Sequence, residues 1–250
     1  MTKILAVSNA KGGVGKTTST INIGAALNQL RKKVLVVDID PQSNLSTSLG
    51  VKNAENNIYG ALRGDYEIQP IEILKNFHLI PSTVELGYIE VELSTKTARE
   101  YYLKDIIDKI KHNYDYVLID CPPSMGNLTI NAFTASDELL IPLQSEFLAM
   151  QGLTELLKNF RLITNRINPS LIICGIFLTQ YDSRKSLNKE VLQIIEQAFP
   201  NELLKTVIRD NVALADAPKY KQDIFRYKPQ SNGAEDYTNL AKEIIKRHKK

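Results

Sequence analysis

Short, continuous apolar runs alternate along the chain with longer stretches in which apolar residues recur every three or four positions. The runs are typical of strands buried on both faces, and the spaced stretches are typical of amphipathic helices. The predicted strands cover residues 4–7, 33–37, 77–80, 114–120, 138–142, 171–179 and 203–208. The predicted helices cover residues 21–30, 97–112, 146–165, 185–199 and 233–247, and the polar segment 43–70 is expected to form a loop with short helices. This alternation predicts an α/β fold, a mostly parallel twisted sheet with helices on both faces.

The length of 250 residues suits one such domain, and no linker rich in Pro, Gly or Ser divides residues 1–250. No apolar run approaches 18 residues, and the first strand starts almost at once, so neither a membrane span nor a signal peptide is expected. The two cysteines, Cys121 and Cys174, indicate neither a disulfide framework nor a metal site. Their small number fits a reducing cytoplasm.

Positive charge is concentrated near the carboxyl terminus. The formal net charge is +3, and residues 181–250 alone carry 14 Lys and Arg against 10 Asp and Glu. This imbalance is compatible with ordinary solvated surface, and it also suits a polyanionic partner.

A glycine-rich loop follows the first predicted strand. Residues 9–20 read N-A-K-G-G-V-G-K-T-T-S-T and lead into the first predicted helix. In a loop that joins a strand to a helix in this way, backbone N–H groups at the helix start can surround a phosphate, and glycines let the backbone approach the phosphate oxygens closely. Lys16 can then reach the β- and γ-phosphates, while the Thr17 hydroxyl can bind Mg²⁺. The usual first glycine is replaced by Ala10, and a second lysine, Lys11, opens the loop.

Acidic residues follow two of the other predicted strands. Asp38 and Asp40 follow the second strand, and Asp120 ends the strand 114–120. Carboxylates at the carboxyl ends of parallel strands lie beside the crevice in which such sheets bind ligands. Four apolar or aromatic residues followed by Asp120 form a Walker B arrangement, in which the carboxylate orders Mg²⁺.

These motifs together resemble the ParA/MinD superfamily of dimerising P-loop ATPases. The loop K-G-G-V-G-K-T resembles the deviant Walker A motif, D-I-D-P-Q at 38–42 resembles switch I, and D-C-P-P at 120–123 resembles Walker B with switch II. The segment 143–152 is similar to the entry into the family's dimer-interface helix. The combination resembles the partition branch, the ParA or Soj-like proteins. No helix-turn-helix domain of the kind that some of them carry before the ATPase is expected here, and residues 246–250 do not resemble the MinD membrane tail.

The resemblance implies a role for each motif residue. The cofactors would be ATP and Mg²⁺, with the nucleotide bound by Lys11, Gly12, Gly13, Val14, Gly15, Lys16, Thr17 and Thr18. Thr17 and Asp120 would hold the metal. Asp40 would orient the attacking water, with Asp38 supporting it or capping the strand end. Lys11 would cross to the phosphates of a second subunit, with an effect similar to that of an arginine finger.

The resemblance also implies partners and a location. The ATP-bound homodimer would bind double-stranded DNA without sequence preference, and a ParB-like centromere-binding protein would stimulate hydrolysis and release it. The protein would be cytoplasmic and nucleoid-associated, without a membrane partner. Three alternatives are a MinD-like membrane-cycling regulator, an ATPase that positions another cargo on the nucleoid, and a nitrogenase-iron-protein-like reductase. The position of the two cysteines disfavours the reductase.

The DNA contacts are expected at the basic carboxyl-terminal quarter. Soj-like proteins carry P-R-N-V-R after the short strand, whereas this chain reads I-R-D-N-V-A at 208–213 and loses both arginine positions, to Asp210 and Ala213. The predicted contacts are therefore redistributed over Arg184, Lys185, Lys189, Arg209, Lys219 and Lys221, with Arg226 and Lys228 as further candidates. The interleaved aromatics Tyr220, Phe225 and Tyr227 are expected to anchor this segment to the core, because duplex DNA offers no unstacked base.

Overall fold

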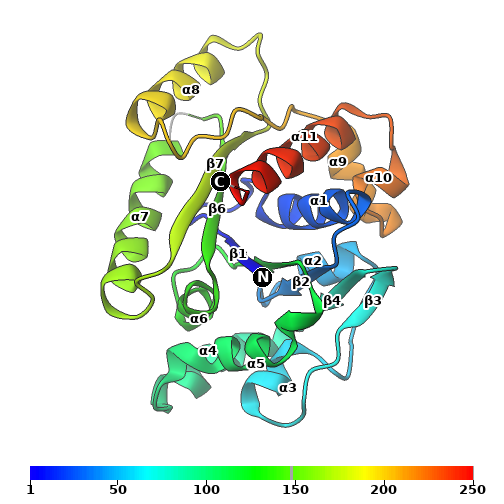
Figure 1. Cartoon of the computed structure of the whole chain (residues 1–250), viewed down its shortest axis with the longest axis vertical. Coiled ribbons are helices and arrows are strands. Elements are labelled where there is room, and N and C mark those ends of the chain that lie inside the picture. Colours follow the sequence, from blue (N-terminus) through cyan, green and yellow to red (C-terminus); the bar gives the residue numbers. More distant parts are fainter. Residues whose placement is uncertain (147–148, 250) are drawn as a thin grey trace.

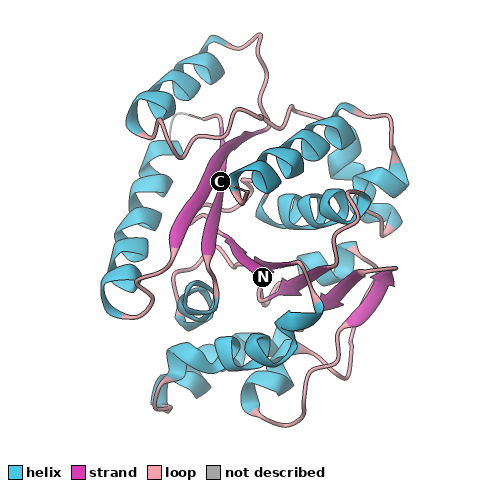
Figure 2. Ribbon diagram, viewed as in Figure 1, coloured by secondary structure: helices cyan, strands magenta, loops and turns pink. Residues whose placement is uncertain are grey.

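The computed structural model describes residues 1–146 and 149–249 (Figure 1). Over these residues the strands form one seven-stranded sheet in the order β3-β4-β2-β5-β1-β6-β7, shown in magenta in Figure 2. The strands are β1 (Lys3–Val7), β2 (Val34–Asp38), β3 (Ile71–Leu74), β4 (Phe77–Ile80), β5 (Tyr116–Asp120), β6 (Glu138–Gln144) and β7 (Ile172–Thr179). Neighbours pair in parallel except β3, which is antiparallel to β4.

Helices connect these strands. They are α1 (Lys16–Gln29), α2 (Asn44–Ser48), α3 (Ile58–Arg63), α4 (Ile89–Glu92), α5 (Tyr102–Ile110), α6 (Asn127–Ala135), α7 (Ala149–Arg166), α8 (Ser186–Ala198), α9 (Val212–Asp216), α10 (Ile224–Tyr227) and α11 (Asn232–Arg247). Short 3₁₀ turns lie at Val84–Tyr88, Leu93–Thr95, Arg99–Tyr101, Lys111–Asn113 and Ala217–Tyr220. The predicted fold class is confirmed.

Each central strand contributes to two hydrophobic cores. In β1, Ile4 and Ala6 face one core while Leu5 and Val7 face the other, as the alternation of side chains along a strand requires. One core lies beneath α1 and α11, which run side by side in Figure 1. The other is closed by α3, α5, α6, α7 and α8. Burial on both faces explains why the strands are continuous apolar runs.

The strand register brings the sequence motifs to one edge. Val7, the last residue of β1, is level with Asp120 in β5, and Asp120 is level with Asp38 in β2. The three central strands therefore end together. The glycine loop after β1 lies beside both carboxylates at the carboxyl edge of the sheet.

The strand predicted over residues 203–208 does not form. Only two isolated bridges, Ile176 to Leu203 and Tyr181 to Arg209, join this segment to the region of β7 within the described residues. Between these two bridges, the carboxylate of Glu243 in α11 accepts hydrogen bonds from the backbone amides of Lys205 and Thr206, at 2.8 and 3.0 Å. A side chain thus takes hydrogen bonds that a strand ladder would have used.

Other differences concern elements without a strong sequence signal. The edge strand β3 and the helix α6 were not predicted, and α5 is shorter than the predicted helix 97–112. The helix predicted over 146–165 corresponds to α7, and the residues at 147 and 148 that belong to its predicted start lie outside the described residues, as does residue 250 of the tail. No described helix is long and apolar enough to cross a membrane.

Candidate nucleotide-binding site

The glycine loop turns sharply from β1 into α1. Gly13 and Gly15 have φ angles of 76° and 84°, in the left-handed region that residues with a Cβ rarely adopt. Gly15 directly precedes α1, so the helix begins at Lys16 and its unpaired N–H groups face the loop. The first turn of α1 contains no acidic residue. This arrangement is suited to an anion such as a phosphate.

Side chains from distant parts of the chain hold the loop in place. The Thr179 hydroxyl donates a hydrogen bond to the carbonyl of Val14 at 2.9 Å, and the side-chain amide of Gln180 donates one to the carbonyl of Gly13 at 3.0 Å. At the front of the loop, the Asn9 side chain accepts the amide of Lys11 at 3.0 Å. Thr179 and Gln180 were not predicted, because only the pairing of β7 beside β6 brings them to the loop.

Lys16 is held inside the site. Its side chain crosses the loop and donates to the carbonyl of Lys11 at 3.1 Å, and the residue is only 7% exposed. Burial lowers the pKa of the Lys16 ammonium, while the nearby carboxylates of Asp120 and Asp40 oppose that change. A buried cation beside a turn of free amides is the expected partner of phosphate oxygens.

The predicted metal-binding pair is brought together. The Thr17 hydroxyl donates to the Asp120 carboxylate at 2.7 Å, and Thr20 in the next turn donates to its other oxygen at 3.2 Å. Burial raises the pKa of Asp120 well above its usual value, and the nearby Asp38 raises it further. Hydroxyl and carboxylate oxygens are the ligands that Mg²⁺ prefers, so Thr17 and Asp120 could hold this ion.

The two aspartates after β2 have different environments. Asp38 is fully buried. Its carboxylate accepts hydrogen bonds from the backbone amide and the hydroxyl of Ser46, at 2.8 and 2.6 Å, and from the backbone amide of Asp40, at 3.1 Å. Burial raises the pKa of Asp38 to about 6. These contacts favour the strand-end cap over a chemical role for Asp38. Asp40 lines the cavity beside the loop and accepts the amide of Gln42 at 2.9 Å.

Two neighbouring cavities extend from the loop. One, of about 450 Å³, is lined by Gly12, Gly13, Gly15, Lys16, Thr17, Thr18, Asp40, Gln42, Asn44, Ser48, Pro123 and Gln180. The other, of about 290 Å³, is lined by Gly15, Thr18, Thr179, Gln180, Ile208, Arg209, Asp210, Asn211, Leu214, Ala215 and Tyr237. The shared residues Gly15, Thr18 and Gln180 make the second cavity a continuation of the first. It suits the nucleoside part of a nucleotide, a placement that the sequence did not indicate.

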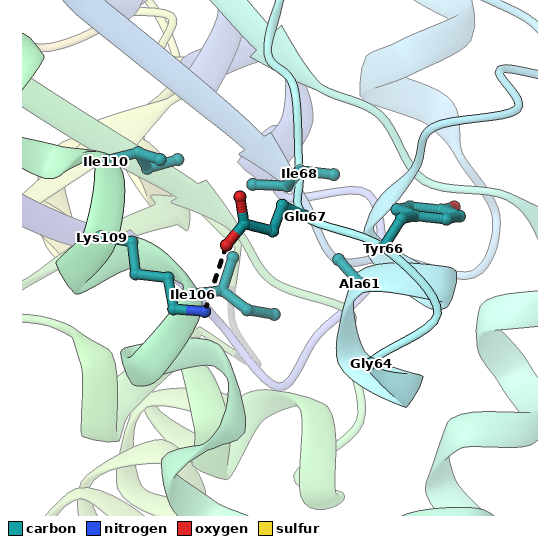
Figure 3. Close-up of a pocket in the computed structure, with 8 residues that line it drawn as sticks. All are labelled: Ala61, Gly64, Tyr66, Glu67, Ile68, Ile106, Lys109 and Ile110. Atoms are coloured by element: carbon teal, nitrogen blue, oxygen red, sulfur yellow. Dashed lines mark ion pairs between the residues drawn. The ribbon is translucent and has the colours of Figure 1, made fainter.

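A further cavity lies elsewhere, between α3 and α5. It measures about 560 Å³, and its walls include Ala61, Ile106 and Ile110 (Figure 3). Its charged residues, Lys109 and Glu67, face each other at 3.9 Å. Gly64, which lines it, ends α3, and the lining residues of α5 belong to the carboxyl-terminal half of that helix. The free backbone groups at helix ends of this kind are carbonyls, so the cavity is not suited to phosphate.

Lys11 lies outside the phosphate cavity. Its side chain is one-third exposed, and its ammonium pairs with the Glu146 carboxylate at 2.5 Å. It is not among the described residues that line the cavity at the P-loop, whereas Lys16 is. The two lysines of the motif therefore occupy different surroundings.

The predicted DNA contacts fall into two groups on different sides of α11 (Figure 1). Arg184, Lys185 and Lys189 lie at the start of α8, and all three are exposed. Lys219 and Lys221 lie beyond α9, where Lys219 pairs with Asp216 at 2.7 Å. Among the described residues, no carboxylate lies within ion-pair distance of Lys185, Lys189 or Lys221.

Arg209 is held differently from the other basic residues. Its guanidinium pairs with Asp236, at 2.6 Å, and with Glu235, at 2.5 Å, both at the start of α11. Asp236 is buried, so this pair is part of the packing. Of the three aromatics expected to anchor the segment, Phe225 and Tyr227 pack against the core, but Tyr220 is 60% exposed and stacks on Tyr227. The core-anchor expectation was wrong for Tyr220.

Comparison with known proteins agrees with this geometry. A family model described as an AAA domain matches residues 2–173. The chain is 45% identical to the sporulation initiation inhibitor protein Soj of Bacillus subtilis, over 98% of each chain. It is 39% identical to the chromosome partitioning protein ParA of Caulobacter vibrioides, over 99% of this chain and 95% of that protein. The chain belongs to the ParA/Soj family of partition ATPases.

A solved structure extends the comparison to the fold of the ParA/Soj chain. The structure described as cobyrinic acid a,c-diamide synthase from Mycobacterium smegmatis, with bound ADP and magnesium, has a TM-score of 0.88 and 34% identity. The match covers all of this chain and 96% of that one. The two chains therefore share one fold over these residues.

Proposed function

We propose that this ParA/Soj chain is a Mg²⁺-dependent ATPase that dimerises when ATP is bound, binds DNA as the dimer and leaves it after hydrolysis. The observation that carries the proposal is the different placement of its two motif lysines. Lys16 is buried in its own phosphate cavity, while Lys11 is partly exposed outside that cavity. A cation at the front of the loop but directed away from it is available to a second subunit.

The bound nucleotide would use both connected cavities. Phosphates would lie against Lys16 and the amides that begin α1, with Mg²⁺ at Thr17 and Asp120. Support comes from the 2.7 Å contact between the last two residues, and from a structural relative described with bound ADP and magnesium. The nucleoside would lie towards Tyr237. Phosphoryl transfer to water needs positioning and charge stabilisation. Asp40, which lines the cavity beside the loop, would orient the water.

Lys11 would connect the two subunits. In the single chain it pairs with Glu146, and both side chains are partly exposed, so opening this pair costs little. In the dimer, the ammonium would move to the phosphates of the partner. ATP would stabilise the dimer by differential contacts, and loss of the γ-phosphate would weaken it. Completing a site with such a cation is worth about 10³–10⁵ in rate.

DNA would bind to the dimer through the exposed basic residues near α8. Two-fold symmetry would double each phosphate contact and give steep salt dependence with little sequence preference. A ParB-like protein would stimulate hydrolysis, in line with the partition proteins to which the chain is related. We take residues 1–250 as one ATPase domain, acting in the cytoplasm on the nucleoid.

Light scattering with a non-hydrolysable ATP analogue and Mg²⁺ tests the proposal. The wild-type chain should double its mass with the analogue and remain a monomer with ADP. Lys11→Ala should bind nucleotide but remain a monomer, and Lys16→Ala should bind nucleotide weakly. A stable Lys11→Ala dimer would contradict the role of Lys11 in the second subunit. Lys109→Ala, which changes an exposed lysine of α5, is the matched control and should dimerise normally.

A further inference from the structure

A cluster of three potential metal ligands lies at the amino-terminal edge of the sheet, opposite the nucleotide site. Glu138 begins β6, Cys174 lies in β7, and His248 follows the last turn of α11. One ligand atom from each side chain lies within 4.8 Å of the other two. Counting cysteines in the sequence excluded a metal site, because the other two ligands lie 36 residues before and 74 residues after Cys174. Only the fold brings them together.

The three ligand atoms converge on one point. His248 Nε2 lies 2.9 Å from Glu138 Oε2 and 3.8 Å from Cys174 Sγ. In a tetrahedral zinc site, bond lengths of about 2.0–2.3 Å place neighbouring ligand atoms roughly 3.4–3.6 Å apart. The two separations at Nε2 bracket these values, and the third separation, between Glu138 and Cys174, is at most 4.8 Å. Side-chain adjustment would therefore convert the cluster into three corners of a tetrahedron, with water as the fourth ligand.

The orientation of His248 distinguishes a metal site from a nucleophilic triad. In a triad, the nucleophile and the carboxylate contact different nitrogens of the imidazole. Here Glu138 and Cys174 both face Nε2, while Nδ1 lies 3.1 Å from the Tyr116 hydroxyl. A neutral His248 that donates from Nδ1 to Tyr116 would present the lone pair of Nε2 to a metal. Such a hydrogen bond from the outer nitrogen is usual for metal-bound histidine.

The surroundings of the cluster are ordered. Glu138 and Cys174 are buried, and the His248 side chain is 8% exposed. The ammonium of Lys3 lies 2.9 Å from Oε1 of Glu138, which leaves Oε2 for the metal. Arg247 donates to the carbonyl of Cys174 and so fixes the end of α11 against β7 (Figure 1).

We propose that Glu138, Cys174 and His248 form a binding site for a thiophilic divalent cation, with Zn²⁺ as the expected ion. Thiolate, imidazole and carboxylate together select zinc over Mg²⁺. On binding, the Sγ–H bond of Cys174 breaks, an Sγ–Zn bond forms, and the proton passes to the buffer. The thiolate and Glu138 supply two negative charges, which offset the ion and leave Lys3 as an outer hydrogen-bond donor.

The bound ion would connect α11 to the sheet. The opposite half of α11 contacts the helix that follows the P-loop, since the Tyr237 hydroxyl lies 3.0 Å from Ser19 Oγ. Zinc would thus fasten one end of a helix whose other half borders the nucleotide cavity. This inference does not depend on ATP hydrolysis or on DNA binding.

Zinc titration of the chelator-stripped full chain tests the proposal. Excess Mg²⁺ is present to occupy the Asp120 site, and a chromophoric chelator competes for the zinc. One Zn²⁺ should bind per chain and raise the melting temperature. Cys174→Ser and His248→Gln should each weaken binding by more than about 100-fold, and Tyr116→Phe, which removes only the outer partner, by about 10-fold. His112→Gln, which changes an exposed histidine, is the matched control and should bind as wild type.

Co²⁺ gives a readout that the wild-type chain can provide by itself. The wild-type chain with Co²⁺ should show a thiolate-to-metal charge-transfer band, which Cys174→Ser and not His112→Gln removes. Absence of that band in the wild-type chain would overturn the proposal. Zinc binding of equal strength in wild type and His248→Gln would also overturn it and leave the cluster as a buried ion pair.

Discussion

The carboxyl edge of the sheet and the basic carboxyl-terminal quarter offer the same kinds of charged side chain in different settings. At the sheet edge, Lys16 and Asp120 are buried, and their contacts are fixed by strand ends and the start of α1. In the basic quarter, Arg184 is exposed on a loop, whereas Arg209 is held by a buried carboxylate. The contacts of a charged side chain in the buried motif are thus fixed by the backbone around it. A charge on the surface depends on which neighbours the fold supplies.

The loss of Lys16 should have the largest effect at the sheet edge. Lys16→Ala removes one partner of a buried charge pair with phosphate, which costs about 2 kcal/mol or more and corresponds to at least about 30-fold weaker nucleotide binding. Calorimetry with ADP and Mg²⁺ measures this loss. Lys11→Ala serves as the control and should change ADP affinity little. Equal losses in both variants would remove the distinction between the two lysines.

Asp40→Ala sharpens the contrast between the paired aspartates. If Asp40 orients the water, hydrolysis should fall by about 10²–10⁴-fold, the usual range for such a group, while ATP binding and dimerisation persist. Asp38→Asn should instead lower the melting temperature, because it weakens the contacts to Ser46. A phosphate-release assay and a thermal melt separate the two. An Asp40→Ala chain that cannot bind ATP would reassign Asp40 to metal binding.

Charge reversal at the start of α8 tests the surface region. Arg184→Glu with Lys185→Glu should abolish binding to duplex DNA and leave ATP-dependent dimerisation intact. Each phosphate contact contributes about −0.9 to the slope of log K against log salt. Lys104→Glu with Lys109→Glu on α5 makes the same charge change far from α8 and should retain DNA binding. Unchanged salt dependence in the α8 variant would locate the DNA surface elsewhere.

Arg184 and Arg209, two of the arginines of the basic quarter, should respond oppositely to neutralisation. Arg209→Gln leaves the buried Asp236 carboxylate short of a partner and should cost about 1–3 kcal/mol of stability, with little effect on DNA binding. Arg184→Gln should reduce DNA affinity and leave the melting temperature nearly unchanged, because its pair with Asp182 is exposed on the arginine side. Urea denaturation and a DNA titration of both variants measure these effects. A large loss of DNA binding in Arg209→Gln would mean that its buried pair opens on DNA.

Local sequence was sufficient to predict the phosphate loop and every strand of the sheet except the edge strand β3. Continuous apolar runs identify buried strands, and the spacing from Lys11 to Thr17 leaves few other uses for so many glycines and lysines. The metal-binding pair was predicted from the P-loop and Walker B motifs. In the structure the ends of β1 and β5 are level, and the first turn of α1 brings Thr17 to Asp120.

Features that depend on distant contacts could not be predicted. The segment 203–208 has strand-like residues, but Glu243 of α11 takes two of its amides. The ion pair that holds Arg209 joins residues 27 positions apart, and Thr179 reaches the loop across 165 positions. No short-range pattern encodes these contacts.

A mixing experiment between two inactive variants tests the central claim most directly. Lys11→Ala keeps Asp40 but has no lysine to supply, whereas Asp40→Ala supplies Lys11 but cannot orient water in its own site. Mixed before ATP is added, with Lys11→Ala in excess, the two should form heterodimers in which the Lys11→Ala subunit has a complete site. ATP hydrolysis should then appear in the mixture although each variant alone is nearly inactive. Hydrolysis no greater than the sum of the separate variants would show that Lys11 acts within its own subunit and would contradict the account.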